Sequence, residues 1–194
     1  MTHIPVRNRR RSILIPRLVV GLAVGILGCD AVSFPTPPAE EVFGATLAGA
    51  NEVPAVTTAA TGSAQFTVSL DTFLAFRLDV AAIDSTTLAH IHEGGAGVPG
   101  NVIVTLFVGP SACRSAANTP INVSSARCRS GFTGELAQGQ FKPSQLTQLP
   151  LSYGATARAR YDSLLVLMRT GNVYVNVHNL VSPGGHVRGQ IQPQ

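Results

Sequence analysis

A period-two alternation of apolar and polar residues is the feature that most constrains the fold of this chain. In the segment SAQFTVSL, residues 63–70, apolar side chains occupy every second position. The segment LAFRLDV, residues 74–80, repeats the pattern after the pair Asp71-Thr72. Because successive side chains of a β-strand point to opposite faces, the two segments predict an antiparallel hairpin with one apolar and one wet face. The predicted inward residues are Ala64, Phe66, Val68, Leu70, Leu74, Phe76, Leu78 and Val80.

Further short segments with the sequence character of strands indicate that antiparallel β-structure continues along the chain. The number and spacing of these strands are typical of an all-β domain, an antiparallel Greek-key β-sandwich or barrel. The segment YDSLLVLMRTGN instead predicts a helix, with Asp162 or Ser163 as its N-cap and Gly171 just beyond its last turn. A second, shorter helical turn is expected in PSQLTQL, residues 143–149. The further predicted strands are residues 43–49, 87–92, 101–108, 130–136, 173–178 and 186–191.

The first 28 residues have the composition of an export signal. They hold five Arg and no acidic residue, and the apolar run LVVGLAVGILG follows the basic part. That run is shorter than the roughly 20 apolar residues that span a membrane. It ends in ILGC, which resembles a bacterial lipobox, so residues 1–28 are predicted to be a lipoprotein-type signal peptide and Cys29 to be lipidated. The alternatives are a plain signal peptide cleaved elsewhere and an uncut signal anchor.

Composition separates a short tether from the domain that follows it. Residues 29–42 are rich in Pro and lack periodicity, which predicts an extended tether, whereas residues 43–194 form the single predicted domain. All ten acidic residues but only nine of the basic ones lie beyond the leader, so the net charge of +4 comes from the leader. No nucleic-acid partner is therefore expected. The predicted location is the bacterial cell envelope, on the periplasmic or surface side, with membrane contact through the lipid anchor.

Two cysteines remain after Cys29. Cys113 and Cys128 flank a polar, turn-rich stretch, and an even pair in an exported protein predicts a disulfide. In the chain-entropy description a bridge closing such a loop stabilises the fold by about 3 kcal/mol. The alternative is two free thiols that act as metal ligands, although neither cysteine lies in a C-x-x-C or C-x-H arrangement.

Four histidines in two segments are the main candidates for chemistry. His90 and His92 lie two residues apart in AHIHEGG, so both project from one face of a strand. His178 ends a later strand, and His186 opens the next one after a Ser-Pro-Gly-Gly turn. If these strands are neighbours, the imidazoles converge on a site that suits copper or zinc. The alternative is a structural role, with the rings bonded to backbone carbonyls or to a carboxylate such as Glu93.

The alternation of side chains along a strand also predicts which residues lie beside these histidines. Tyr174 and Asn176 share the histidine-bearing face of their strand, with valines packed behind them. Arg188 is predicted to pair with a carboxylate across the sheet, either Glu52 or Glu93. The alternative is that Arg188 binds an anion beside the histidines.

Three sequence blocks carry a resemblance to a known family. ANEVPAV, AHIHEGGAGVPGNVIVTL and YVNVHNLVSPGGHVRGQI resemble, in this order, the blocks of the CHRD domain, first described in chordin and common in bacterial exported proteins. The resemblance covers residues 43–192, and His186 departs from the Glu that the family usually has there. The extracellular growth-factor binding of chordin does not transfer to a short bacterial lipoprotein.

A weaker likeness is to copper–zinc superoxide dismutase. That family also places two histidines two apart on a strand of a β-sandwich, so His90 and His92 would match this pair and His178 a later copper ligand. The bridging histidine, the zinc-loop histidines and the arginine over copper are not evident in the sequence. The expected architecture is thus immunoglobulin-like or superoxide-dismutase-like, while support for the enzyme is weak.

These observations order three classes of function. The favoured one is a non-enzymatic CHRD-domain lipoprotein that binds a protein or glycan, because no nucleophile–base pair or carboxylate pair stands out and no catalytic residue is assigned. The second is a copper- or zinc-binding domain whose ligands are His90, His92, His178 and His186. The third and least favoured is a copper oxidoreductase.

Overall fold

The computed structural model describes residues 40–69, 73–109, 130–146 and 149–194. The chain divides into two units, Met1–Thr36 and Pro37–Gln194, and every described residue belongs to the second unit. The predicted signal peptide, the lipidation site Cys29 and the predicted disulfide of Cys113 and Cys128 lie outside the described residues. Within the described ranges, no helix has the length and apolar character needed to cross a membrane.

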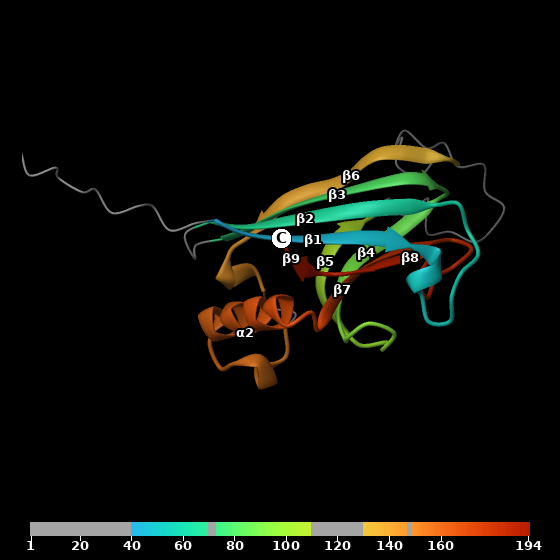
Figure 1. Ribbon diagram of the computed structural model, residues 1–194. Helices are drawn as coiled ribbons and strands as arrows, with labels where there is room; N and C mark the ends of the chain where they lie inside the picture. The colour runs from blue at the N-terminus through green and yellow to red at the C-terminus, as the bar shows by residue number, and fades with distance from the viewer. Residues whose placement is uncertain (1–39, 70–72, 110–129, 147–148) are drawn as a thin grey trace, which may run out of the picture. The chain divides into compact units, whose positions relative to one another are not determined.

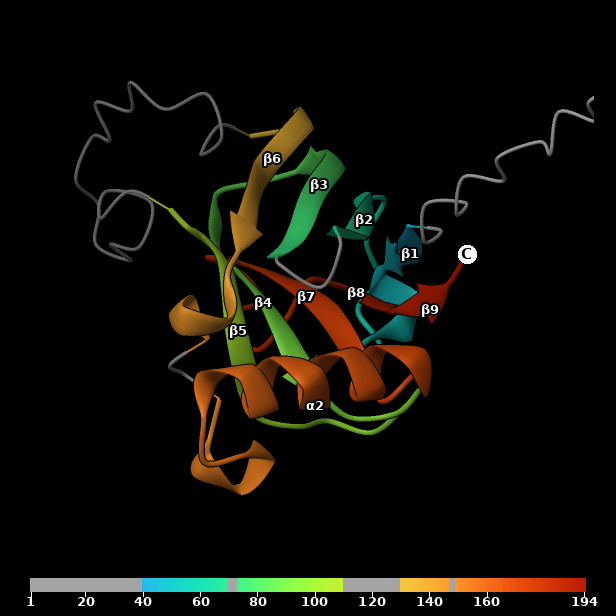
Figure 2. The same cartoon turned by 90° about the vertical axis from the view of Figure 1, so that its left-hand side faces the viewer.

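Antiparallel strands build nearly the whole described unit (Figure 1). They are paired in the order β5-β4-β7-β8-β1-β2-β3-β6, and β9 adds to β1. The first and last strands of this order also contact each other, so the sheet curls into a nearly closed barrel (Figure 2). The predicted antiparallel β-fold is confirmed. The strands are β1 (Glu41–Ala48), β2 (Thr61–Ser69), β3 (Phe73–Ile83), β4 (Thr86–Glu93), β5 (Val102–Val108), β6 (Phe132–Phe141), β7 (Val173–Asn179), β8 (Val187–Gln190) and β9 (Gln192–Pro193).

The hairpin predicted from alternation is β2 and β3. Phe66 lies opposite Phe76 and Ala64 opposite Leu78, and all four side chains are buried in the core. On the wet face Arg77 and Asp79 form an ion pair of 2.7 Å. Period-two patterning therefore decides both the register and the buried face here.

The helical segments lie beside the sheet and include one α-helix, α2 (Ala157–Arg169), near β9 (Figure 1). The predicted N-cap at Asp162 or Ser163 is wrong: Thr156 caps the helix, and its Oγ1 accepts from the amide of Ala159 at 3.1 Å. The apolar run used for the prediction starts late because the first turn of the helix alternates Ala and Arg and has no large apolar side chain. Gly171 follows the helix with a φ of 65°, as predicted. The short 3-10 helices are η1 (Gly49–Asn51), η3 (Pro143–Gln145), which confirms the second predicted turn, and η4 (Leu151–Tyr153).

Strands β4, β7 and β8 present two very different faces. The inner face is apolar and joins the core, with Ile91, Val175 and Val187 each fully buried. Cross-strand pairing places the residues of the opposite face side by side, since His90 lies opposite Asn176 and Asn176 opposite Arg188. We call this the polar face. Its members are His90, His92, Tyr174, Asn176, His178, Arg188 and Gln190.

Loops cover the polar face and remove most of it from water. Arg188 Nη2 donates to the carbonyl oxygens of Gly95 and Val98, each at 2.9 Å, and thereby holds down the loop between β4 and β5. From the other side, Asn51 Nδ2 donates to the carbonyl oxygen of Arg188 at 3.0 Å. The result is a layer of buried polar side chains between the sheet and these loops.

Candidate metal centre

Three histidines of the polar face form one compact cluster. His90 and His92 come from β4 and His178 from the adjacent strand β7. Each ring offers one nitrogen such that the three nitrogens lie within 4.8 Å of one another. The side chains are buried, with exposed fractions of 8%, 8% and 6%. The convergence predicted from the spacing of these histidines is confirmed for these three residues.

Backbone carbonyls fix the orientation of two of the rings. His92 Nδ1 donates to the carbonyl oxygen of Gly100 at 3.0 Å, and His178 Nδ1 donates to that of Pro183 at 3.0 Å. Since a carbonyl can only accept, each Nδ1 carries the proton and each Nε2 of the neutral ring keeps its lone pair. Metal-binding histidines are typically oriented in this way, with the second ring nitrogen bonded to a carbonyl.

The remaining polar atoms of the cluster are incompletely satisfied. His178 Nε2 meets His90 Nδ1 at 3.1 Å, so the His90 nitrogen supplies the proton of that hydrogen bond. His92 Nε2 is buried and has no hydrogen-bond partner among the described residues. A buried ring nitrogen with a free lone pair costs free energy unless water or a cation meets it. The donor set thus fits a metal ion that prefers imidazole ligands.

Burial keeps all three rings neutral at physiological pH. Desolvation, as the largest cause, together with the charges that His178 and His92 would carry, lowers the pKa of His90 to about 4. Desolvation also lowers the pKa of His92 and of His178. A neutral imidazole is the form that ligates a metal, so protons compete weakly for these nitrogens at neutral pH.

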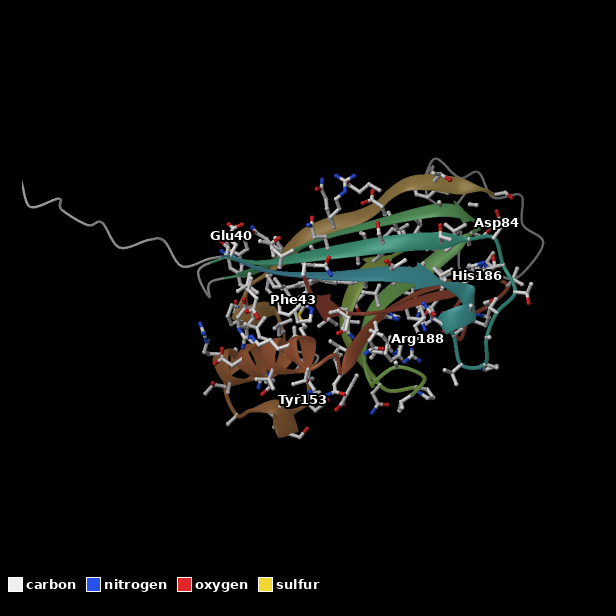
Figure 3. The ribbon with its side chains drawn as sticks, in the orientation of Figure 1. Glu40, Phe43, Asp84, Tyr153, His186 and Arg188 are labelled. Atoms are coloured by element: carbon white, nitrogen blue, oxygen red, sulfur yellow. The ribbon has the colours of Figure 1, made fainter. Side chains whose placement is uncertain are left out.

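A stack of aromatic and cationic groups flanks the cluster at His92. The rings of His92 and Tyr174 are nearly parallel, with centroids 5.0 Å apart and an interplanar angle of 10°. The guanidinium carbon of Arg188 lies 3.4 Å from the centroid of the Tyr174 ring, in a cation–π contact. Arg188, labelled in Figure 3, belongs to β8. Only 3% of it is exposed, and its positive charge contributes to the lowered pKa of His92.

A buried carboxyl group lies on the other side of the polar face. Glu52 accepts a hydrogen bond of 3.4 Å from Asn176 Nδ2, whereas its Oε1 has no hydrogen-bond partner in the part of the chain that the structure describes. Burial raises the pKa of Glu52 to about 7, against the opposing effect of the Arg188 charge. A side chain added at Gly185 would meet Asn176 and Glu52 within 2.7 Å, so the glycine there allows this close packing.

Two sequence predictions for this region need correction. Arg188 donates to loop carbonyls rather than to the carboxylate of Glu52 or Glu93, because the loop between β4 and β5 folds over its guanidinium. Glu93 is instead hydrogen-bonded to the hydroxyl of Tyr153, whose pKa is raised to about 12 mainly by burial. Neither predicted ion pair is found among the described residues.

His186 lies outside the three-histidine cluster. Its Nε2 contacts Thr58 Oγ1 at 3.0 Å, and its Nδ1 contacts Ser182 Oγ at 3.2 Å. It is also near Asp84 (Figure 3), whose charge opposes the lowering of the His186 pKa by burial. The structure therefore brings together three of the four predicted ligands and gives His186 hydroxyl partners.

Comparison with known protein families shows to which family this chain belongs. A profile of the CHRD domain matches residues 43–191, which is most of the chain. The chain belongs to the CHRD domain family. Searches of curated proteins and of solved structures found no match. The resemblance predicted from the sequence blocks is thus confirmed over residues 43–191 of this CHRD domain.

Sequence reasoning missed part of what surrounds the histidines of the CHRD domain. It placed Tyr174 and Asn176 on the correct face but gave no indication that Tyr174 stacks on His92. It considered Glu52 only as a partner of Arg188, not as a buried acid bonded to Asn176. The only available indication was that ANEVPAV belongs to a block shared with the family.

Proposed function

We propose that this CHRD domain binds a transition-metal ion, copper or zinc, through His90, His92 and His178. The observation that carries the proposal is the convergence of three buried ring nitrogens within 4.8 Å of one another. Zinc–nitrogen bonds are about 2.0–2.1 Å long, so small rotations of the rings bring three such atoms onto one ion. Neutral imidazole is a preferred ligand of both metals.

The hydrogen bonds of the cluster support ligation over a purely structural role. A structural histidine is expected to have its ring nitrogens paired with the protein, but within the described ranges the buried His92 Nε2 has no partner. The outer nitrogens of His92 and His178 are already fixed by carbonyl oxygens, which leaves both inner nitrogens directed away from those bonds. Only the hydrogen bond between His90 and His178 has to be given up on metal binding.

The hydrogen bond between His90 and His178 also determines what must happen to the His90 proton when a metal ion binds. His90 Nδ1 donates a proton to His178 Nε2 in the metal-free cluster. For both nitrogens to ligate, that proton has to move from His90 Nδ1 to Nε2 of the same ring, which keeps the imidazole neutral. Metal binding therefore replaces one hydrogen bond by two coordinate bonds and does not require rearrangement of the strands.

The proposed setting is the bacterial cell envelope. The ILGC sequence at Cys29 and the Pro-rich segment after it support an exported, lipid-anchored domain that meets metal ions outside the cytoplasm. We further propose that the domain has no enzymatic activity. Binding of a protein or glycan partner stays a prediction from the sequence.

Titration of the full chain with zinc and copper tests the proposed site. We expect one equivalent of ion to bind, as measured by equilibrium dialysis with elemental analysis. His92→Gln and His178→Gln should each weaken binding at least tenfold, because each removes one of three nitrogens. His186→Gln is the matched control, since it changes a histidine just before β8 that lies outside the cluster, and it should bind normally. Equal binding by all four proteins would show that any ion is held elsewhere.

A further inference from the structure

A permanent positive charge lies buried beside the proposed ligands. The guanidinium of Arg188 is 3.4 Å from the centroid of the Tyr174 ring, and the centroid of that ring is 5.0 Å from that of His92. The charge is therefore within roughly 8 Å of the His92 ring, a separation at which two unit charges still interact appreciably inside a protein. Arginine stays protonated under all ordinary conditions, so this charge is fixed.

The proposed ligands do not neutralise the charge of an incoming ion. The cluster consists of three imidazoles, with no carboxylate or thiolate among the group found in the described residues. A doubly charged ion thus experiences twice the repulsion from Arg188 that a singly charged ion experiences. Glu52 faces Arg188 from the other side but is itself buried, with 8% of its surface exposed, and part of it is protonated at neutral pH.

We propose that Arg188 is a specificity-determining residue of the metal site, and that its charge favours a monovalent ion of the Cu(I) type over divalent ions such as Zn(II). This inference rests on the proposed function, and it narrows the expected metal from copper or zinc to a monovalent ion. The number of ligands points in the same direction. Zinc sites with only three protein ligands hold a water or substrate at the fourth position. Cu(I) and Ag(I) form stable two- and three-coordinate complexes, so the three histidines alone complete the coordination of a monovalent ion.

Burial of the site adds to this preference. The three histidines have at most 8% of their surface exposed, which leaves little access for the water that would complete a zinc coordination shell. The loop held by Arg188 through the carbonyls of Gly95 and Val98 helps to maintain this cover. Arg188 thus acts through its charge and through the loop, and the two effects can be separated by experiment.

Competition titrations with Ag(I) and Zn(II) test the charge effect, since both ions are d10 and need no added reductant. The measured quantity is the ratio of the two affinities for the full chain, in chloride-free buffer with a chelating indicator. Arg188→Gln should lower the preference for Ag(I) about tenfold, which is the effect of one unit charge at this separation at an intermediate effective dielectric. Arg188→Lys keeps the charge and should retain the ratio. Arg77→Gln, which alters an exposed arginine, is the control and should also retain it.

The outcomes distinguish the two proposals. Loosening of the loop would weaken both ions together and leave the ratio unchanged in Arg188→Gln, which would overturn the charge inference while metal binding stands. Failure of the unmodified chain to bind either ion would overturn both. If Arg188→Gln does not fold, Glu52→Gln takes its place. Removal of the opposing carboxylate should then raise the preference for Ag(I), and an unchanged or lowered preference would contradict the inference.

Discussion

Replacement of Glu52 by glutamine should change how the stability of the domain depends on pH. Glu52 is 8% exposed, and burial raises its pKa from 4.5 to about 7. In the unfolded chain the carboxyl is solvated and ionises at its ordinary pKa. Between these two values the folded state holds a proton that the unfolded state has released.

The sign follows from this difference in bound protons. Because the unfolded state binds fewer protons, the free energy of unfolding falls as the pH rises from about 4.5 to about 7. The rise in the pKa of Glu52 on folding corresponds to about 3 kcal/mol in the free energy of unfolding, at 1.36 kcal/mol for each pH unit. The contribution is present in full below pH 4.5 and is lost as the pH rises through the folded-state pKa. The glutamine variant cannot ionise and should lack this loss.

Urea unfolding of the metal-free chain at pH 5, 6, 7 and 8 measures the effect. The histidines of the cluster also titrate, with lowered pKa values, so they destabilise the fold as the pH falls below 6.5. Both proteins contain these histidines. The difference between their free energies of unfolding at each pH therefore removes the histidine contribution. We expect the free energy of unfolding of the variant to rise by about 2.5 kcal/mol relative to that of the unmodified chain between pH 5 and pH 8, because part of the contribution is already lost at pH 5.

The exposed residue Glu40 provides the matched control. Glu40→Gln makes the same chemical change at the surface and should leave the difference constant with pH. A stability difference for Glu52→Gln that is also independent of pH would refute the reasoning. It would mean that the carboxyl is solvated or paired in the folded protein.

Two further predictions concern the parts of the chain beyond the described residues. Export should remove residues 1–28 and leave an acylated Cys29, and intact-mass analysis of the membrane fraction checks this; an unmodified Cys29, or normal membrane fractionation of Cys29→Ser, would contradict it. Cys113 and Cys128 should be joined by a disulfide, so peptide mapping without reductant should recover the two cysteines in one linked fragment, whereas two free thiols would exclude the bridge.

The fold could be predicted largely because strand alternation is a local property. In β2 and β3 each side chain is directed by its position in the pleat, so the sequence alone identifies Phe66 and Phe76 as inward-facing. The same rule places His90 and His92 together on one face of their strand and His178 on the polar face of its own strand. Their actual proximity depends on the pairing of β4 with β7, which alternation does not specify.

The surroundings of the histidines were harder to predict because they depend on long-range contacts. Glu52 reaches Asn176 across 124 residues of sequence, and Arg188 reaches Val98 across 90. Both contacts are made by loops that fold over the sheet, and the path of a loop is not encoded in a periodic pattern. For the same reason the pattern does not indicate that loops bury the polar face of β4 and β7.

X-ray absorption spectroscopy of the metal-loaded full chain tests the central claim most directly. We predict a first coordination shell of three nitrogens at about 2.0 Å with the outer-shell scattering of three imidazole rings. His92→Gln should reduce the imidazole count to two, and His186→Gln should leave it at three. A shell dominated by sulfur or carboxylate oxygen, or an imidazole count that does not change in His92→Gln, would contradict the assignment of the three-histidine cluster as the metal site.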